Sequence, residues 1–439
     1  MAKGNKIKGN KQNFKRPKYK KKQKTTDVTS SHTPEKAVQS TQVASTPKAT
    51  IKNMAEAPEP TLGIKEGKAT IVLNATDTLF FRESRPMESM GELQSVFPPS
   101  VQTLAGAVRT FIGDQQGINW HEFNAEHELA KIIGYGDNLG ALTFNGAWLS
   151  YNGERLYPAP QLLMQKEETI SRLTISKKSL WCDLGKNVYL PKLADDAQGS
   201  KPLENTWLNQ QGLNAVLQGT TPQQDSIFKA EDLFTTESRV GIGRDNATRA
   251  VVKSLLYQTE HIRPKEGLGI ELDVAGLPND MATSAIVRLG GEGRSASLSL
   301  QQKENKLPKS PTANGNTQGI ILYLLTALKF KQSGKDWQPL PDFEKQETAE
   351  QTLWIGTING IELELHSAIT GKATRDGGWD LAKHQPRTAN PLIPSGSAFF
   401  CKIKAGDDIN TALQTLHNNQ IGEQTEYGLG HIAAGLWQK

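Results

Sequence analysis

A glycine-rich segment between arginines is the first candidate for chemistry in this chain of 439 residues. The segment "RLGGEGRSASL" places three glycines between two arginines: Arg288, Gly290, Gly291, Gly293 and Arg294. Glycine permits sharp turns and a close backbone approach to a ligand, and guanidinium groups bind anions. The segment therefore predicts a phosphate-binding loop, a nucleotide fingerprint or a tight turn between two strands.

Three other segments also combine glycine or aromatic residues with arginine or histidine. They are "FFRESRP" (80–86), "RVGIGRDNATRA" (239–250) and "EYGLGHIAAGLW" (426–437). Glycine exposes backbone N–H groups that can bind phosphate oxygens, and arginine adds paired donors. Each segment alone is more typical of a turn with a solvated side chain, but their recurrence favours an anion-binding surface.

Known catalytic patterns are incomplete in this chain. "TGKATR" at Thr370 lacks the outer residues of a phosphate-binding P-loop, and "GIGRDN" at Gly241 lacks the third glycine of a dinucleotide fingerprint. His121 and His127 are six positions apart, which suits neither one helix face nor a zinc site. We therefore expect no catalytic residue, no metal and no cofactor.

The positive charge is concentrated at the N-terminus. Residues 1–24 contain eleven Lys or Arg and no acid, which leaves 40 basic and 46 acidic residues in the rest. The polar segment that follows has few large apolar residues, so we expect residues 1–66 to form a disordered, Lys-rich tail. The tail is either a solubilising extension or an arm that contacts nucleic acid, with Phe14 and Tyr19 able to stack on bases.

Cysteine content and targeting signals indicate a soluble, cytoplasmic protein. Only Cys182 and Cys401 occur, which fits a reducing compartment. The basic N-terminus is followed by no apolar stretch typical of a secretory signal, and "GIILYLLTALKF" at Gly319 is too short to span a membrane.

Alternating strand and helix patterns occur twice along the chain. In the first half we expect a strand at 68–75, a helix after Ser100 as N-cap, and a hairpin around Asn152-Gly153. Residues 191–235 are expected to be a partly irregular insertion. In the second half we expect strands around Asn359-Gly360 and an amphipathic helix at 407–419. Two α+β units are therefore expected.

The most linker-like segment separates these halves. "KENKLPKSPTANGNTQ", from Lys303 to Gln318, has two prolines and no residue expected in a core. We therefore predict an N-terminal domain at 67–302, a linker at 303–317 and a C-terminal domain at 318–439.

Several of these segments, in order, resemble one family. "DTLFFRESRPM" and "PPSVQTLAGAVRT" are similar to the opening of the third subunit of the Cmr complex, a type III-B CRISPR effector, in the RAMP superfamily. The similarity continues through "RVGIGRDNATRAVVKSLLYQTEHIRP", "RLGGEGRSASL", "GGWD", "NPLIPSGSAFF" and "YGLGHIAAG". It spans roughly residues 68–439.

The resemblance implies a fold and a role. The fold would be two ferredoxin-like (RRM-like) RAMP domains with insertions. The subunit would be a non-catalytic component of an antiviral ribonucleoprotein, placed at the foot of the complex. It would hold the 5′ tag of the CRISPR RNA and contact the large polymerase-type subunit and backbone RAMP subunits, meeting target RNA indirectly. No membrane contact is implied.

The resemblance also indicates which residues would contact RNA. The "RLGGEGR" loop would expose its backbone to phosphates, and Phe80, Phe81 and Tyr257 are possible stacking platforms, although core packing of the first strand is the better explanation for the two phenylalanines. The expected RNA contacts are Arg82, Arg85, Arg109, Arg239, Arg244, Arg249, Arg288, Gly290, Gly291, Gly293, Arg294, Gly428, Gly430 and His431.

Two alternatives remain open at this point. A RAMP endoribonuclease that processes CRISPR repeat RNA would use a histidine as acid or base without metal, with His431 or His261 (near Arg263) as candidates. A general RNA-binding protein would instead use its basic tail as an arm. Incubation with labelled repeat RNA in EDTA separates the first alternative from a non-catalytic subunit.

Overall fold

The computed structural model describes most of the chain beyond the basic tail. The described residues are 67–83, 92–182, 185–245, 247–303, 307–332, 338–380, 385–404 and 406–438. The expected tail at 1–66 and the candidate Arg85 lie outside them. No helix among the described residues is long and apolar enough to cross a membrane.

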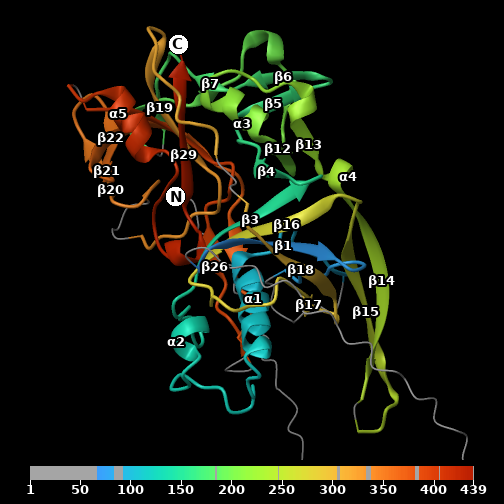
Figure 1. Cartoon of the computed structure of the whole chain (residues 1–439). Coiled ribbons are helices and arrows are strands. Elements are labelled where there is room, and N and C mark those ends of the chain that lie inside the picture. Colours follow the sequence, from blue (N-terminus) through green and yellow to red (C-terminus); the bar gives the residue numbers. More distant parts are fainter. Residues whose placement is uncertain are drawn as a thin grey trace, which may run out of the picture. The chain divides into compact units, whose positions relative to one another are not determined.

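The first half is built on an eight-stranded antiparallel sheet (Figure 1). Its order is β13-β12-β4-β3-β16-β1-β18-β17. Four adjacent long strands are β3 (Thr143–Tyr151), β16 (Leu268–Ala275), β1 (Ala69–Ala75) and β18 (Ser295–Gln301). The other strands are β13 (Ile227–Lys229), β12 (Thr206–Leu208) and β4 (Glu154–Pro158) on one side of them and β17 (Ser284–Arg288) on the other. As expected, Asn152 and Gly153 form the turn between β3 and β4, with φ of 50° and 82°.

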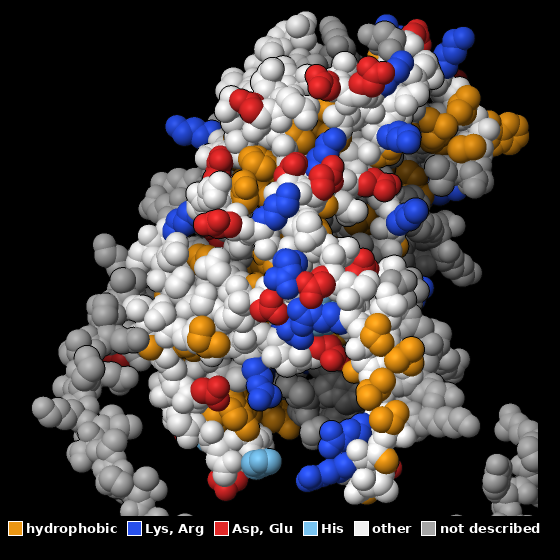
Figure 2. Space-filling model, turned by 90° about the vertical axis from the view of Figure 1, so that its right-hand side faces the viewer, with side chains coloured by type: hydrophobic (Ala, Val, Ile, Leu, Met, Phe, Trp, Pro, Cys, Tyr) orange, Lys and Arg blue, Asp and Glu red, His pale blue; other side chains and the backbone are white. Residues whose placement is uncertain are grey.

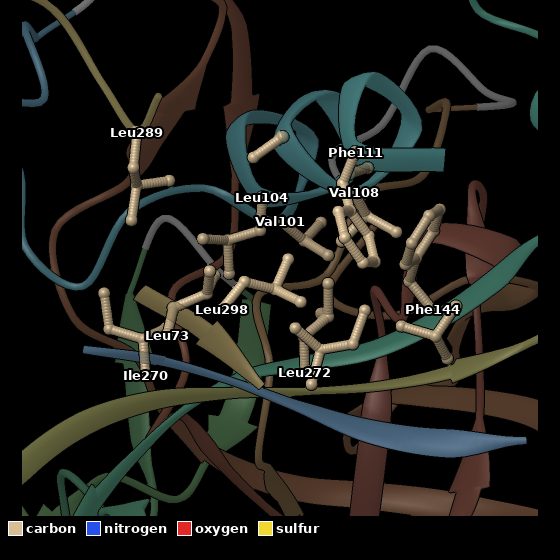
Figure 3. Packing of buried hydrophobic residues seen from close by; sticks show 14 of the residues in the cluster. Leu73, Val101, Leu104, Val108, Phe111, Phe144, Ile270, Leu272, Leu289 and Leu298 are labelled. Atoms are coloured by element: carbon tan, nitrogen blue, oxygen red, sulfur yellow. The ribbon is translucent and has the colours of Figure 1, made fainter. Parts of the chain in front are cut away.

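Helix α1 (Val101–Gln115) covers one face of this sheet (Figure 3). The Ser100 side chain accepts a hydrogen bond from the Thr103 N–H, which confirms the expected N-cap. Apolar residues recur along α1 at helical spacing, so one stripe of the helix is buried. The core they share with the sheet includes Leu104, Val108, Phe111, Leu73, Leu272 and Leu298. The short helix α2 (Ala130–Ile133) follows α1.

The second half is built on a seven-stranded sheet in the order β20-β21-β22-β27-β19-β29-β28. Its strands are β20 (Phe343–Glu347), β21 (Thr352–Ile358), β22 (Ile361–Ile369), β27 (Ala398–Ile403), β19 (Thr317–Leu324), β29 (His431–Gln438) and β28 (Asn419–Gln420). Helix α5 (Ile409–Leu416) buries Leu413 and Leu416 in the core of this sheet. Asp408 caps α5, and Asn359-Gly360 forms the expected turn between β21 and β22.

The segment 191–235 is more regular than its Gln- and Asn-rich composition indicates. It contributes β12 and β13 to the first sheet, and it contains the helices α3 (Gln210–Leu217) and α4 (Ala230–Leu233). In α3, Leu213 and Leu217 are buried in a core that includes residues of the second half, such as Ile321. The expectation of a partly irregular insertion did not include helix α3, which forms because apolar residues at helical spacing outweigh the polar composition.

The two halves share apolar packing around the predicted linker. Residues 302–316 contain no helix or strand in their described part. Contrary to expectation, Leu307 of this segment packs against the core that also holds Trp148 of the first half and Tyr323 of the second. The sheets lie on either side of this segment in sequence, and the division into two domains remains a prediction.

The remaining sheets comprise one long ribbon and several short strands. The ribbon is formed by β14 (Phe234–Arg244) and β15 (Val251–Pro264), and β15 also pairs with β2 (Glu92–Leu93). Between β4 and α3 lie β5 (Leu163–Lys166), β6 (Thr169–Arg172), β7 (Thr174–Ile175), β8 (Leu180–Cys182), β9 (Gly185–Val188), β10 (Pro191–Lys192) and β11 (Lys201–Pro202). Between β22 and β27 lie β23 (Thr374–Asp376), β24 (Trp379–Asp380), β25 (Gln385–Pro386) and β26 (Asn390–Leu392).

Candidate nucleic-acid interface

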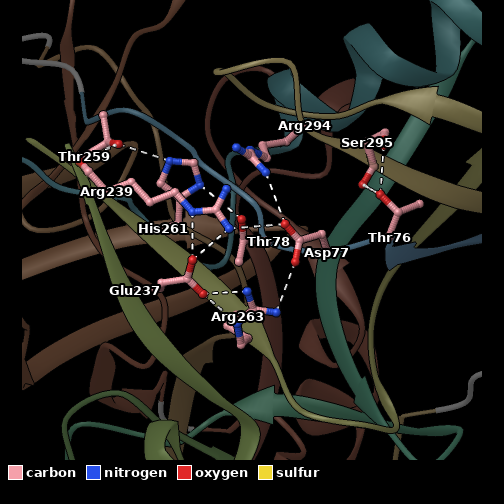
Figure 4. A network of polar contacts seen from close by, with 10 residues as sticks. All are labelled: Thr76, Asp77, Thr78, Glu237, Arg239, Thr259, His261, Arg263, Arg294 and Ser295. Atoms are coloured by element: carbon pink, nitrogen blue, oxygen red, sulfur yellow. Dashed lines mark hydrogen bonds and ion pairs between the residues drawn. The ribbon is translucent and has the colours of Figure 1, made fainter. Parts of the chain in front are cut away.

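Three arginines from separate segments converge on one carboxylate (Figure 4). Asp77, just after β1, accepts from Arg239 of β14 and Arg294 of the β17–β18 turn, each N–O distance being 3.2 Å. Arg263 of β15 donates to the other oxygen of Asp77 at 3.1 Å. We call Arg239, Arg263 and Arg294 the arginine cluster. Segments that are far apart in sequence thus form one cationic surface.

The ribbon supplies a second carboxylate to the arginine cluster. Glu237 Oε1 lies 2.7 Å from Arg239 Nη2, and Glu237 Oε2 lies 2.5 Å from Arg263 Nη2. The ladder pairs Glu237 with His261 and Arg239 with Thr259, so these residues share one face of the ribbon. The three arginines and two carboxylates leave one net positive charge at this surface.

The ion pairs keep both carboxylates charged. The Arg239 side chain, followed by Arg263, holds the pKa of Asp77 below its usual value. Arg263 and then Arg239 lower the pKa of Glu237 in the same way. Arg294 is 22% exposed, and its Nε is buried with no hydrogen-bond partner among the described residues. Because guanidinium groups bind carboxylates and phosphates through the same N–H donors, phosphate oxygens can compete for this surface.

A buried histidine lies beneath the cluster. His261 is 1% exposed and contacts two hydroxyls, with Nδ1 at 3.2 Å from Thr78 Oγ1 and Nε2 at 3.1 Å from Thr259 Oγ1. Its ring stacks on Phe80 at a centroid distance of 5.1 Å. Burial, followed by the charges of Arg294 and Arg239, lowers the pKa of His261. The neutral imidazole therefore supports the cluster from below.

The glycine-rich loop is the turn between β17 and β18. The Gly291 N–H donates to the Phe80 carbonyl at 2.8 Å, so this amide is not available to a phosphate. Gly290 (φ 81°) and Gly293 (φ 66°) are in the left-handed region, whereas Gly291 is not among the residues with positive φ. Positive φ is therefore confined to two of the three glycines of this loop. The loop instead positions Arg294. The Arg294 N–H donates a hydrogen bond to the Gly291 carbonyl, and the Arg294 carbonyl accepts one from the Leu289 N–H.

The ribbon has an exposed apolar stripe on its other face. Val240 and Ile242 are 68% and 55% exposed, and Leu256, opposite Ile242, is 62% exposed. Figure 2 shows orange side chains following the ribbon toward blue side chains near its end. Near that end lie Arg244 and Arg249, both of them exposed. Alternation along the strands thus separates an arginine face from an aliphatic face.

The other predicted arginines lie apart from the cluster contacts. Arg82 and Arg288 are exposed and make no ion pair with a described residue. Arg109 is half-buried on α1 and donates to the Gly136 carbonyl at 3.1 Å. Burial lowers the pKa of Arg109, and the positive charge of Arg387 adds to that effect. Their roles in RNA contact remain predictions.

The C-terminal glycines and histidine have structural positions. Gly428, Gly430 and His431 are all buried, so none presents a surface to RNA in this conformation. A Cβ at Gly430 would lie 1.8 Å from the Ile421 carbonyl oxygen, and one at Gly428 would lie 2.8 Å from the Phe144 carbonyl oxygen. Their assignment as direct RNA contacts is therefore corrected: the glycines allow close backbone packing.

The proposed stacking platforms are also mostly buried. Phe80 and Phe81 are 3% and 6% exposed, so they pack in the core and offer no ring face to a base. Tyr257 is half-buried, and its ring lies against Gly241 of the ribbon, where a Cβ would meet it at 2.3 Å. Only Tyr257 of the three keeps a partly accessible ring.

Sequence inspection missed three members of the site. Asp77, Glu237 and Arg263 complete the cluster but were not among the expected contacts. A signal was present, since Glu237 and Arg239, like His261 and Arg263, are two positions apart and must share a strand face. The acidic members were overlooked because the expectation concerned positive charge alone.

These features define a strand-rich α/β protein with an arginine cluster suited to binding a polyanion. A sequence profile of the CRISPR-associated protein family Cas_Cmr3 matches residues 71–437, and the chain belongs to that family. This confirms the resemblance to the third subunit of the Cmr complex of type III-B CRISPR effectors. A search of curated protein sequences gave no match.

Solved CRISPR complexes contain similar chains. One is a type III-B Cmr-beta complex bound to cognate target RNA and AMPPnP, with 16% identity and a TM-score of 0.42 over 75% of this chain and 86% of the other. Another is a Csm3-Csm4 subcomplex of a type III-A complex, with 12% identity and a TM-score of 0.32 over 78% and 94%.

Proposed function

We propose that this chain is a non-catalytic RNA-binding subunit of a type III-B effector. It holds the 5′ tag of the CRISPR RNA and bridges to the large subunit and the backbone subunits. The observation that carries the proposal is the convergence of Arg239, Arg263 and Arg294 in a member of the Cmr3 family. Single-stranded RNA presents phosphates at a spacing that several fixed guanidinium groups can engage together.

The two carboxylates, Asp77 and Glu237, pre-order the arginine cluster for binding to RNA phosphates. Asp77 and Glu237 hold the guanidinium groups in fixed positions before RNA arrives, which lowers the entropy lost on binding. An RNA phosphate then takes over N–H donors that the carboxylates occupy. RNA that reaches only one arginine gains too little to displace them, so the site favours a bound segment that spans the cluster.

The ribbon suits the bridging role. Its arginine face is directed at Asp77, while Val240, Ile242 and Leu256 form an aliphatic stripe on the other face. Exposed aliphatic side chains in a row are typical of protein contacts. One ribbon can thus contact RNA with one face and a neighbouring subunit with the other.

We further propose that both sheets derive from the ferredoxin-like fold. In β3-β16-β1-β18 and in β22-β27-β19-β29, the first strand in sequence lies between the third and the fourth, and the second pairs with the third. This is the ferredoxin-like order. The first unit keeps the helix after its first strand (α1), and the second keeps the helix after its third (α5).

The burial of both candidate histidines favours a non-catalytic subunit over an endoribonuclease. His261 and His431 are 1% and 3% exposed. A general acid or base must come within hydrogen-bond reach of the RNA 2′-hydroxyl or leaving oxygen. Neither imidazole meets that requirement in this conformation.

Co-expression with the other Cmr subunits and a CRISPR array tests the proposal. The chain should co-purify with the large subunit and CRISPR RNA. Ile242→Ser with Leu256→Ser should weaken incorporation into the complex but leave the RNA affinity of the isolated chain unchanged. The control, Thr169→Ser, changes an exposed residue away from the ribbon and should do neither.

A nuclease assay distinguishes the proposed non-catalytic subunit from a metal-independent endoribonuclease. The isolated chain should leave labelled repeat RNA intact in EDTA. Cleavage that His431→Ala or His261→Ala abolishes would contradict the proposal and identify a metal-independent endoribonuclease.

A further inference from the structure

The most exposed large apolar side chain among the described residues is a tryptophan away from the arginine cluster. Trp181 is 82% exposed on β8, and Leu180 beside it is 48% exposed. Tryptophan is highly buried on average, so an indole this exposed beside a second exposed apolar side chain marks a candidate binding surface. The hairpin β8–β9 that carries it belongs to the insertion between β4 and α3.

Strand β9, which pairs with the strand that carries Trp181, anchors the hairpin on the second sheet. The ladder pairs Leu180 with Val188 and Cys182 with Gly185, so Trp181 lies opposite the segment Lys186–Asn187. The Lys186 N–H donates to Thr352 Oγ1 at 3.0 Å, and Gly185 packs so closely on Thr352 that a Cβ would meet it at 2.3 Å. Anchored on β21 of the second sheet, the hairpin presents the indole outward.

Lysines outnumber acids in the sequence around Trp181, although Glu347 of β20 lies close enough to Lys186 for Lys186 to lower its pKa. Residues 176–192 contain four lysines and one aspartate. Lys177 and Lys178 are exposed and form no ion pair with a described residue, while Lys192 pairs with Asp195 at 3.3 Å. A stacking ring next to lysines is the combination that binds single-stranded nucleic acid without base preference.

Another tryptophan offers a comparison within the chain. Trp120 is 41% exposed, but its Nε1 donates to Asp114 at 2.7 Å. Residues 114–128 contain four acids and no Lys or Arg. Phosphates are repelled there, so exposure alone does not make a nucleic-acid site, and the lysines distinguish the surroundings of Trp181.

We propose that Trp181, Lys177 and Lys178 form a second single-stranded RNA contact, distinct from the arginine cluster. The indole stacks on one base, and the lysines neutralise the adjacent phosphates. The site would guide an RNA strand across the insertion, and it does not depend on tag recognition by the arginine cluster.

Photocrosslinking of the full chain to oligouridine tests this site directly. Trypsin releases Trp181 in the peptide Ser179–Lys186 and Trp120 in the peptide Thr110–Lys131. After ultraviolet irradiation, mass spectrometry should find uridine on the first peptide and not on the second. This local signal is independent of RNA bound by the basic tail, and it is measured equally well when the arginine cluster is mutated.

Three variants separate stacking from other contacts. Trp181→Phe should keep the crosslink at Ser179–Lys186, because a phenyl ring still stacks, whereas Trp181→Leu should lower its yield at least about fivefold. Lys177→Ala with Lys178→Ala should also lower the yield and weaken its salt dependence; without these two cleavage sites, trypsin releases Trp181 of this variant in the peptide Leu173–Lys186.

Two results would overturn the proposal. One is an absence of crosslinks at Ser179–Lys186 while other peptides of the same sample are crosslinked. The other is an equal crosslink yield from Trp181→Leu and the parent chain, together with loss of incorporation of Trp181→Leu into the Cmr complex. That second result would identify the hairpin as a protein-docking surface.

Discussion

Arg294 and Asp77 are 217 positions apart, yet Arg294 Nη1 lies 3.2 Å from Asp77 Oδ2. The glycine-rich turn brings Arg294 to the end of β1, and the same Asp77 oxygen accepts from Arg239 of the ribbon. One carboxylate therefore joins three segments that the sequence resemblance had linked to RNA. Asp77 therefore organises the arginine cluster, and under the proposed function it also competes with RNA phosphate.

Replacing Asp77 tests the competition. Asp77→Asn removes a negative charge and keeps the side-chain shape, so RNA phosphates meet less competition at Arg294 and Arg239. We expect tighter RNA binding, by roughly 1 kcal/mol, and a steeper dependence of affinity on salt. Titration of labelled RNA at several salt concentrations measures both. Weaker binding would mean that ordering of the arginines outweighs competition.

The glycine-rich turn should respond differently at two adjacent positions. A Cβ at Gly290 would lie 2.4 Å from the Phe80 carbonyl oxygen at a φ of 81°, whereas one at Gly291 would lie 3.1 Å from a Phe80 ring carbon. Gly290→Ala should therefore lower Tm clearly, and Gly291→Ala should change Tm and RNA affinity little. Loss of RNA affinity in Gly291→Ala at unchanged Tm would restore the phosphate-cradle interpretation.

Gly430, near the C-terminus, should be important for the stability of the fold. Gly430→Ala places a Cβ 1.8 Å from the Ile421 carbonyl oxygen at a φ of 70°, and we expect a loss of about 3 kcal/mol or more. The matched control is Gly106→Ala in α1, where nothing lies within 4 Å and the helix should gain about 1 kcal/mol. Chemical denaturation measures both, and equal stability of the two variants would contradict the close packing of Gly430 on Ile421.

Burial of His431 predicts a pH dependence of stability. Burial, followed by the charges of His417 and Arg155, lowers the pKa of His431 from 6.5 to about 4. The unfolded chain therefore binds a proton first as the pH falls. The stabilisation that depends on a neutral His431 is fully present above pH 6.5. As the pH falls from 6.5 to about 4, the free energy of unfolding loses this contribution, which is on the order of 3 kcal/mol.

His431→Gln should remove this part of the pH dependence. The free energy of unfolding of the variant should fall less steeply than that of the parent between pH 6.5 and 4. His121→Gln, at an exposed position, is the control and should leave the profile unchanged. Parallel profiles for the parent and His431→Gln would show that His431 titrates alike in both states.

Local patterns predicted many elements because their causes are local. The Ser100 cap, the apolar spacing of α1 and the Asn152-Gly153 turn each depend on a few neighbouring residues, and the structure has all three. Helix α3 was missed because its Gln and Asn residues conceal Leu213 and Leu217, which become buried only against the second half of the chain. Tertiary packing there outweighs composition.

The site was predictable only in part. Arg239 and Arg294 were expected from glycine-rich segments, but the carboxylate that joins them lies in the loop after β1. Pairing between distant strands brings them together, and no short motif encodes such pairing. The same limit explains Gly428 and His431, whose segment resembled an exposed loop and is buried against β3.

The most direct test of the central claim is the affinity of the chain for the CRISPR RNA recovered from the assembled complex. Arg294→Ala should cost about 1–3 kcal/mol, and the triple change of Arg239, Arg263 and Arg294 to Ala should weaken binding at least about a hundredfold. The control changes three exposed lysines to Ala, Lys131, Lys166 and Lys404, and thus alters net charge equally. It should weaken binding only a few-fold. Equal losses in the two triple variants, or none in the arginine variant, would contradict RNA binding by the arginine cluster.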